Sequence, residues 1–374
     1  MARFALPTLD DLRALGTPHE NAITIYAQTS PAPDEREASH LNAKSAFDRA
    51  IRHLRDTGIR HGTEQALRER WETVVNDEIW QHLSRSLAIF VADDLTEVFV
   101  LPNHLENQLQ VGTYFDVGQL VRPVTTPQSA FALTLSTNGW NLWEATPTTL
   151  ATEMDLSGDH GSDAADATNR ATIRDRAHVR RLVGDEGKKV LLETYAKRVA
   201  EAVKSELGPA DPNAERPLFL FATDPLLDLY RAHDHGRSIV PVPGGPDDLR
   251  ADEIDAAIRR ELTAINAKHN SARVDHIADG TARGLVAAEL EDIARAATSG
   301  AISTLVYNFT LDIMGTLDNE TGEITYTDDG YDLLSRLAVT VLDRGGEAIA
   351  VRPDEITALI WNDTAVGGLR FPLT

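Results

Sequence analysis

The sequence predicts an α/β protein with three domains, and three features of the chain lead to this prediction. The chain has 374 residues, which corresponds to two or three domains of roughly 100–200 residues each. Hydrophobic residues make up 42% of it, enough to form buried cores. Apolar, strand-like runs alternate with segments of helical periodicity, which is typical of a central mixed sheet covered by helices. We place the domains at residues 1–112, 113–270 and 271–374.

The first domain is predicted to begin with a strand and two helices. Residues 22–27 alternate apolar and polar side chains, as a half-buried strand does. Four apolar side chains then recur at helical spacing before Gly58, where a helix is expected to end: Leu41, Phe47, Ile51 and Leu54. A second helix is predicted over 63–83. Two short strands are expected after it, over 87–91 and 97–101.

The middle domain is predicted from a hairpin and the elements that follow it. Two apolar segments, 130–136 and 140–144, flank the Asn138-Gly139 pair, which is a strong hairpin signal. The small, polar segment 157–170 has no periodicity and is expected to form a loop before a long helix over 172–207. The other expected elements are strands over 150–156, 217–222 and 238–242, and helices over 226–230 and 249–267.

The third domain is predicted to be an α/β/α sandwich of about 100 residues, because helices and strands alternate along it. Its expected elements are helices over 275–298 and 331–342, and strands over 302–307, 348–351 and 367–371.

Composition excludes several classes of site. The chain has no cysteine, which excludes disulfides, thiolate zinc sites, iron–sulfur clusters and cysteine nucleophiles. The His233-Asp234-His235 run is interpreted as a surface turn, because adjacent residues on a loop splay apart. We therefore predict no metal site and no cofactor. The sequence shows no secretory signal and no membrane span, so we expect a cytoplasmic protein.

Charge is unevenly distributed along the chain. Aspartate and glutamate total 58 against 36 lysines and arginines, a net charge of −22, which opposes binding to nucleic acid. Two basic islands stand against this average. Residues 170–204 hold ten basic and five acidic side chains, and residues 49–70 hold six and three, so the islands carry +5 and +3.

The arginines in these islands recur at spacings of three and four residues, so they can share a helix face and bind phosphates. The alternative interpretation is a solvated helix with intrahelical pairs such as Glu193–Lys197. We predict RNA contacts at eight positions: Arg170, Arg174, Arg180, Arg181, Lys188, Lys189, Arg49 and Arg52.

Several short motifs, in this order, resemble the bacterial branch of the archaeo-eukaryotic peptide-chain release factor family, which is related to Pelota. They are AITIYAQ (22–28), Phe115-Asp116-Val117, ALTLSTNGWNLWEA (132–145), TEMDL (152–156), RGGE (344–347) and GGLRF (367–371). The resemblance implies a factor that enters the ribosomal A site. It also implies a middle-domain loop that reaches the peptidyl-transferase centre, and a C-terminal domain similar to the kink-turn-binding ribosomal-protein fold.

The chain departs from the releasing members of that family at the loop. Those members carry Gly-Gly-Gln there, whereas an alignment on His160-Gly161 puts Asp163, Ala164 and Ala165 at the matching positions, and the tripeptide occurs nowhere in the sequence. The Asn-Ile-Lys-Ser stop-codon motif is also absent. Ester hydrolysis needs a positioned water and stabilisation of the oxyanion, for which the loop offers only Asp159 and His160 as candidates.

These observations favour a ribosome-binding translation factor that acts in rescue or hibernation without Gly-Gly-Gln-type hydrolysis. The expected partners are the ribosome and its rRNA, with tRNA or a translational GTPase as further partners. Two alternatives stay open: a hydrolase of peptidyl-tRNA or another ester, and a non-ribosomal scaffold for protein interactions. Whether the chain is an enzyme is therefore left undecided.

Overall fold

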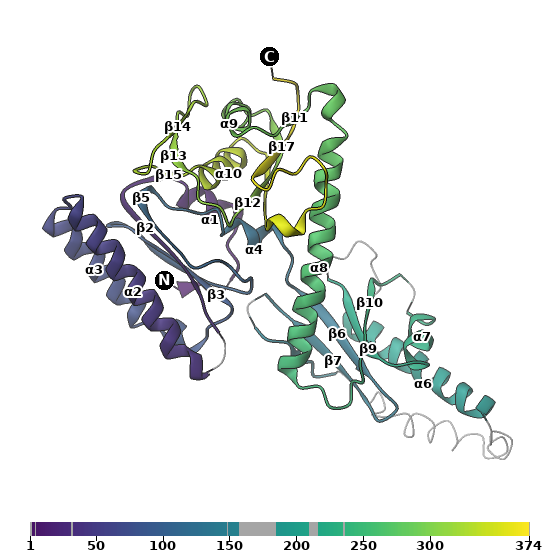
Figure 1. Ribbon diagram of the computed structural model, residues 1–374. Helices are drawn as coiled ribbons and strands as arrows, with labels where there is room; N and C mark the ends of the chain where they lie inside the picture. Colours follow the sequence, from purple (N-terminus) through teal and green to yellow (C-terminus); the bar gives the residue numbers. More distant parts are fainter. Residues whose placement is uncertain are drawn as a thin grey trace. The chain divides into compact units, whose positions relative to one another are not determined.

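The computed structural model describes residues 2–3, 5–30, 33–147, 149–156, 185–208, 216–234 and 236–373 (Figure 1). This part of the chain confirms the predicted α/β class, with several sheets and helices. It separates into two compact units, residues 1–126 with 263–374, and residues 127–262. The three-domain division and the kink-turn-protein likeness stay predictions. The loop 157–170, with Asp159 and His160, lies outside the described residues.

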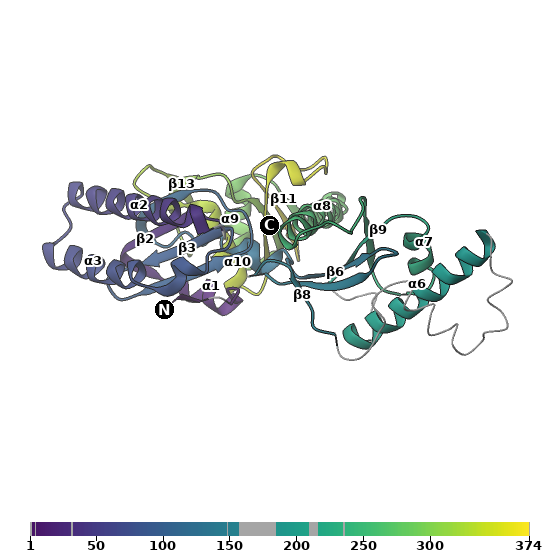
Figure 2. The same ribbon diagram turned by 90° about the horizontal axis from the view of Figure 1, so that it is seen from below.

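The first part of unit 1 contains a five-stranded sheet with two long helices on one face (Figures 1 and 2). Its strand order is β1 (Ala2–Arg3), β4 (Thr96–Leu101), β3 (Ser86–Val91), β2 (Pro18–Gln28) and β5 (Gln108–Tyr114). Alternate residues of β2 point to opposite faces. Ile23 and Ile25 therefore pack against helices α2 (Arg36–Asp56) and α3 (His61–Val75). Between these helices, Phe47 stacks on Trp71 with the ring centroids 4.5 Å apart.

The second part of unit 1 packs against the other face of this sheet. Ala22 and Tyr26 share one apolar core with helices α9 (Leu290–Thr298) and α10 (Leu333–Asp343). Two further sheets lie here, with the strand orders β11 (Val286–Ala287), β17 (Ala365–Leu369), β12 (Ile302–Asn308), β16 (Glu347–Val351), and β14 (Ile324–Tyr326), β13 (Met314–Leu317), β15 (Tyr331–Asp332). Because the core is continuous, residues 1–126 and 263–374 bury each other's apolar surface.

Polar contacts also join the two parts of unit 1. Arg122, in the short helix α4 (Val121–Thr125), donates to Glu355 and to the carbonyl of Ala350 at 2.9 Å. The two charged side chains are only 7% and 6% exposed. Tyr307 donates its hydroxyl hydrogen to the Gly118 carbonyl at 2.5 Å. These buried hydrogen bonds therefore join residues 118–122 to residues 307–355.

Unit 2 contains a five-stranded sheet that includes the predicted hairpin. Its order is β10 (Ile239–Val242), β9 (Leu218–Ala222), β6 (Ala130–Leu135), β7 (Trp140–Ala145) and β8 (Thr152–Glu153). β6 and β7 pair from Leu135 with Trp140, so the Asn138-Gly139 turn is confirmed. Helices α6 (Asp185–Leu207) and α7 (Leu226–Arg231) cover this sheet with Tyr195 and Tyr230 buried.

Some predicted boundaries were wrong. Instead of helices over 249–267 and 275–298, one helix α8 runs over Ala251–Ala278. No Gly or Pro interrupts the segment between them, and the turn falls later, where Gly284 adopts φ +66°. The predicted helix over 63–83 ends at Val75, and Asp77 caps a short 3₁₀ turn after it. β5 was not predicted, and neither was α1 (Leu9–Leu15) with its Thr8 capping box.

Candidate nucleic-acid interface

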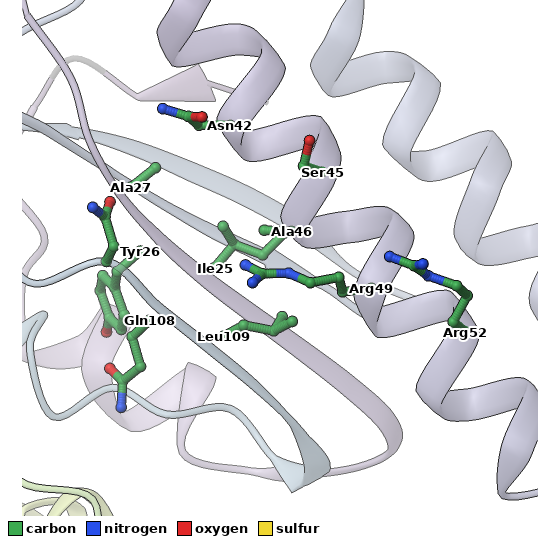
Figure 3. A pocket seen from close by; sticks show the side chains of 11 residues that line it. Ile25, Tyr26, Ala27, Asn42, Ser45, Ala46, Arg49, Arg52, Gln108 and Leu109 are labelled. Carbon is green, nitrogen blue, oxygen red and sulfur yellow. The ribbon is translucent and has the colours of Figure 1, made fainter.

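A groove of about 740 Å³ lies between α2 and the β2–β5 edge of the first sheet, and we call it the α2 groove (Figure 3). It is lined by Ile25, Tyr26, Ala27, Asn42, Ser45, Ala46, Arg49, Arg52, Asn107, Gln108 and Leu109. Two of the predicted RNA-contact residues, Arg49 and Arg52, therefore line one cavity. This volume is in the range of small-molecule sites, so the groove can accept a small ligand or part of a polymer.

One stripe of α2 supplies the polar side of the groove. Asn42, Ser45, Arg49 and Arg52 are spaced by three, four and three residues, which places them on one face of a 3.6-residue helix. All four are exposed. Figure 3 shows the Arg49 side chain extending from α2 toward β2 and β5. The apolar stripe of the same helix, with Phe47, faces the core and fixes this orientation.

The floor of the groove is apolar and the rim opposite α2 carries amides. Ile25 and Ala46 are buried, and Leu109 of β5 packs against the same core. On the opposite rim, the Asn107 Oδ1 accepts a hydrogen bond from the Gln28 backbone N–H at 2.7 Å. The Oε1 of Gln108 accepts from Gln119 Nε2 at 2.6 Å. These amides are thus held in place by the fold.

Neighbouring side chains decide which arginines of the 49–70 island keep an available charge. Arg55 and Arg68 both donate to Glu64, at N–O distances of 2.5 and 2.9 Å. These hydrogen bonds lower the pKa of Glu64 to about 2. Arg70 donates to the backbone carbonyl of Asp93 at 2.8 Å. Arg55 and Arg68 therefore share the carboxylate of Glu64, and the available charge of the island is concentrated on the other arginines.

Arg49 and Arg52 differ from these arginines. Within the described part of the chain Arg49 makes no ion pair, and Arg52 donates its Nε–H only to the Asp48 carbonyl at 3.3 Å. A guanidinium without a carboxylate partner can bind a phosphate bidentately without first breaking an ion pair. The groove thus combines two available cations, several amides and an apolar floor.

The second predicted island is described only in part. Arg170, Arg174, Arg180 and Arg181 lie outside the described residues, and of Lys188 only the helical backbone is described. Lys189 is exposed on α6, in unit 2, whereas Arg49 and Arg52 belong to unit 1. RNA contact at residues 170–189 stays a prediction.

Other candidate sites are occupied by structural contacts. Asp234 accepts a hydrogen bond from the Tyr230 hydroxyl at 3.0 Å and pairs with Arg237 at 3.3 Å, so its carboxylate stabilises the turn. Among the residues with described placement, no three His, Asp or Glu side chains are grouped to hold a metal ion. No helix in that same part of the chain is long and apolar enough to cross a membrane.

Sequence reasoning missed four polar residues of the groove. Asn42 and Ser45 could have been found from their helical spacing to Arg49 and Arg52. Asn107 and Gln108 could not, because β5 was not predicted and its pairing with β2 joins residues about eighty positions apart.

Residues 127–268 match the family model described as bacterial archaeo-eukaryotic release factor family 11. No curated protein matches the chain. Among solved structures, Pelota from Archaeoglobus fulgidus is 14% identical, with 99% of this chain and 94% of that chain covered and a TM-score of 0.38. An archaeal translation termination factor is 15% identical, with 97% and 96% covered and a TM-score of 0.24. Dom34 from S. cerevisiae, a translation termination-like factor, is 13% identical, with 65% and 63% covered and a TM-score of 0.32.

Proposed function

We propose that this chain, whose residues 127–268 belong to the bacterial archaeo-eukaryotic release factor family, is a ribosome-binding translation factor that contacts RNA through the α2 groove. The family was predicted from the sequence, and its match coincides almost completely with unit 2, residues 127–262. The observation that carries the RNA contact is the pair Arg49 and Arg52, which lines the groove without a carboxylate partner.

The chemistry of the groove suits a single RNA strand. Guanidinium groups bind phosphates with planar, paired hydrogen bonds. Amides such as Asn42 and Asn107 can donate to and accept from base edges, and the apolar floor can cover a base face. Because the whole chain carries −22, such binding depends on local contacts and weakens steeply with salt.

The mode of action that follows is occupancy of the ribosomal A site in rescue or hibernation, with rRNA as the main contact and tRNA or a translational GTPase as further partners. This role requires no hydrolysis of peptidyl-tRNA, and it is therefore compatible with the lack of Gly-Gly-Gln in the chain. It also needs no cofactor. A protein of this kind acts in the cytoplasm, where ribosomes are present.

Co-sedimentation of the full chain with 70S ribosomes at physiological salt tests the proposal. The native chain is expected in the ribosome fraction. For the double variant Arg49→Gln, Arg52→Gln, the amount of protein in that fraction is expected to fall by at least half. Arg60→Gln is the matched control, because Arg60 is exposed at the start of α3, outside the groove. Equal loss with the control, or no sedimentation of the native chain in any growth state, contradicts the proposal.

A further inference from the structure

The loop between β4 and β5, residues 102–107, carries a histidine placed between two arginines. The Nη1 of Arg85 lies 2.9 Å from the Nε2 of His104. Arg352, which follows β16, donates from Nη2 to the His104 carbonyl at 2.9 Å and from Nη1 to Glu106. Three chain segments thus meet at His104, with Arg85 at its ring and Arg352 at its backbone carbonyl.

The contact with Arg85 determines the protonation state of this imidazole. A guanidinium only donates hydrogen bonds, so the Nε2 of His104 must be the acceptor and the ring is neutral with its hydrogen on Nδ1. In a protonated ring both nitrogens donate, and the Arg85 contact is lost. Protonation of His104 therefore releases Arg85 from its contact with the ring.

The charges around His104 oppose its protonation in the free protein. The groups that act on it are Arg85, Arg352 and Glu106, two cations against one carboxylate. Burial, Arg85 and Arg352 lower the pKa of His104, and Glu106 alone raises it. A ligand that brings negative charge reverses this balance, because it compensates the arginines and favours the imidazolium form.

The loop is held firmly and adjoins the α2 groove. Leu105 is fully buried, its N–H donates to Ser86 Oγ at 3.1 Å, and its carbonyl accepts from Gln28 Nε2 at 2.9 Å. Asn107, on the groove rim, is three residues from His104, so their Cα atoms lie within about 11 Å of each other. An RNA strand that occupies the groove can therefore extend onto this loop.

We propose that Arg85 and His104 bind a phosphate of the same RNA strand, and that His104 takes up one proton when it binds. The proton comes from solvent and is placed on Nε2 of His104. Arg85 leaves that nitrogen, and the guanidinium and the imidazolium both donate to the phosphate oxygens. This inference rests on the proposed function, which supplies RNA as the ligand.

The test is the affinity of the full chain for a short single-stranded RNA between pH 8 and pH 6 at constant ionic strength. The affinity is expected to rise as the pH falls, by at most about tenfold per pH unit, the limit for uptake of one proton. His104→Gln keeps an acceptor for Arg85 but cannot be protonated, so it is expected to bind as the native chain does at pH 8 and to lose the rise. Arg85→Gln is expected to bind more weakly throughout.

His53→Gln is the matched control, because His53 is an exposed histidine on α2 beside Arg52. The control is expected to keep the full pH dependence. If His104→Gln keeps it too, or if the native chain binds equally at both pH values, the inference is wrong while the proposed function stands. If the native chain binds no RNA at any pH, both fail.

Discussion

The salt dependence of RNA binding tests the role of the α2 groove quantitatively. The perturbation is the double variant Arg49→Gln, Arg52→Gln. Both side chains are exposed, and neither pairs with a carboxylate in the part of the chain that the structure describes. Each phosphate contact to a single strand adds about 0.7 to the slope of log affinity against log salt. Two contacts therefore contribute about 1.4.

The slope is measured by fluorescence anisotropy with a labelled single-stranded RNA over a series of KCl concentrations. Between about 50 and 200 mM salt, the native chain is expected to lose about sevenfold more affinity than the double variant. Arg60→Gln removes one positive charge outside the groove and is expected to leave the slope within the experimental error.

Two results would refute this reasoning. An unchanged slope in the double variant means that neither arginine contacts a phosphate. An equal change in Arg60→Gln means that the charge of the island matters and the groove does not.

Three further predictions concern charges that the fold has already paired or buried. Glu64→Gln frees the two arginines that it binds, so RNA affinity at low salt is expected to rise and the same titration to steepen by at most about 1.4. Arg122→Met leaves the Glu355 carboxylate buried without its charged partner, so the free energy of unfolding is expected to fall by about 3–5 kcal/mol. Hydrogen exchange of the β16 amides measures this change, and a fall below about 1 kcal/mol contradicts the prediction. Burial raises the pKa of Asp116 to about 6. The native state therefore holds a proton that the unfolded chain has released between about pH 4 and 6, so stability falls as the pH rises through this range. Burial also raises the pKa of Asp332, so Asp116→Asn is expected to reduce this fall in urea unfolding between pH 4.5 and 7.5 without abolishing it, and an unchanged difference would speak against it.

Local patterns were predictable wherever neighbouring residues decide the structure. The hairpin at Asn138-Gly139 was confirmed because its turn is set by the two residues themselves. In α2, Phe47, Ile51 and Leu54 are buried as expected, whereas Leu41 is 54% exposed. Six residues at 100° each put Leu41 about 120° away from Phe47 around the helix, off the apolar stripe.

Which arginines are available for a ligand could not be predicted from the chain order. The sequence shows six arginines against three acids in residues 49–70. Glu64 and Arg68 lie one turn apart on α3, so their pair follows from spacing, but only the packing of α3 beside α2 brings Glu64 to Arg55. The Arg55 pair depends on the distance between two helices, which a count of charges along the chain does not contain.

The amino-acid order alone determined the α/β class, the helical spacing of Arg49 and Arg52, the lack of Gly-Gly-Gln and the resemblance to the release factor family, because each depends on composition or on residues close together in the chain. The tertiary structure decided the rest. It paired β5 with β2 to place Asn107 opposite Arg49, and it brought Arg85 and Arg352 to His104. These contacts join segments tens to hundreds of residues apart, and only the burial of a shared core brings such segments together.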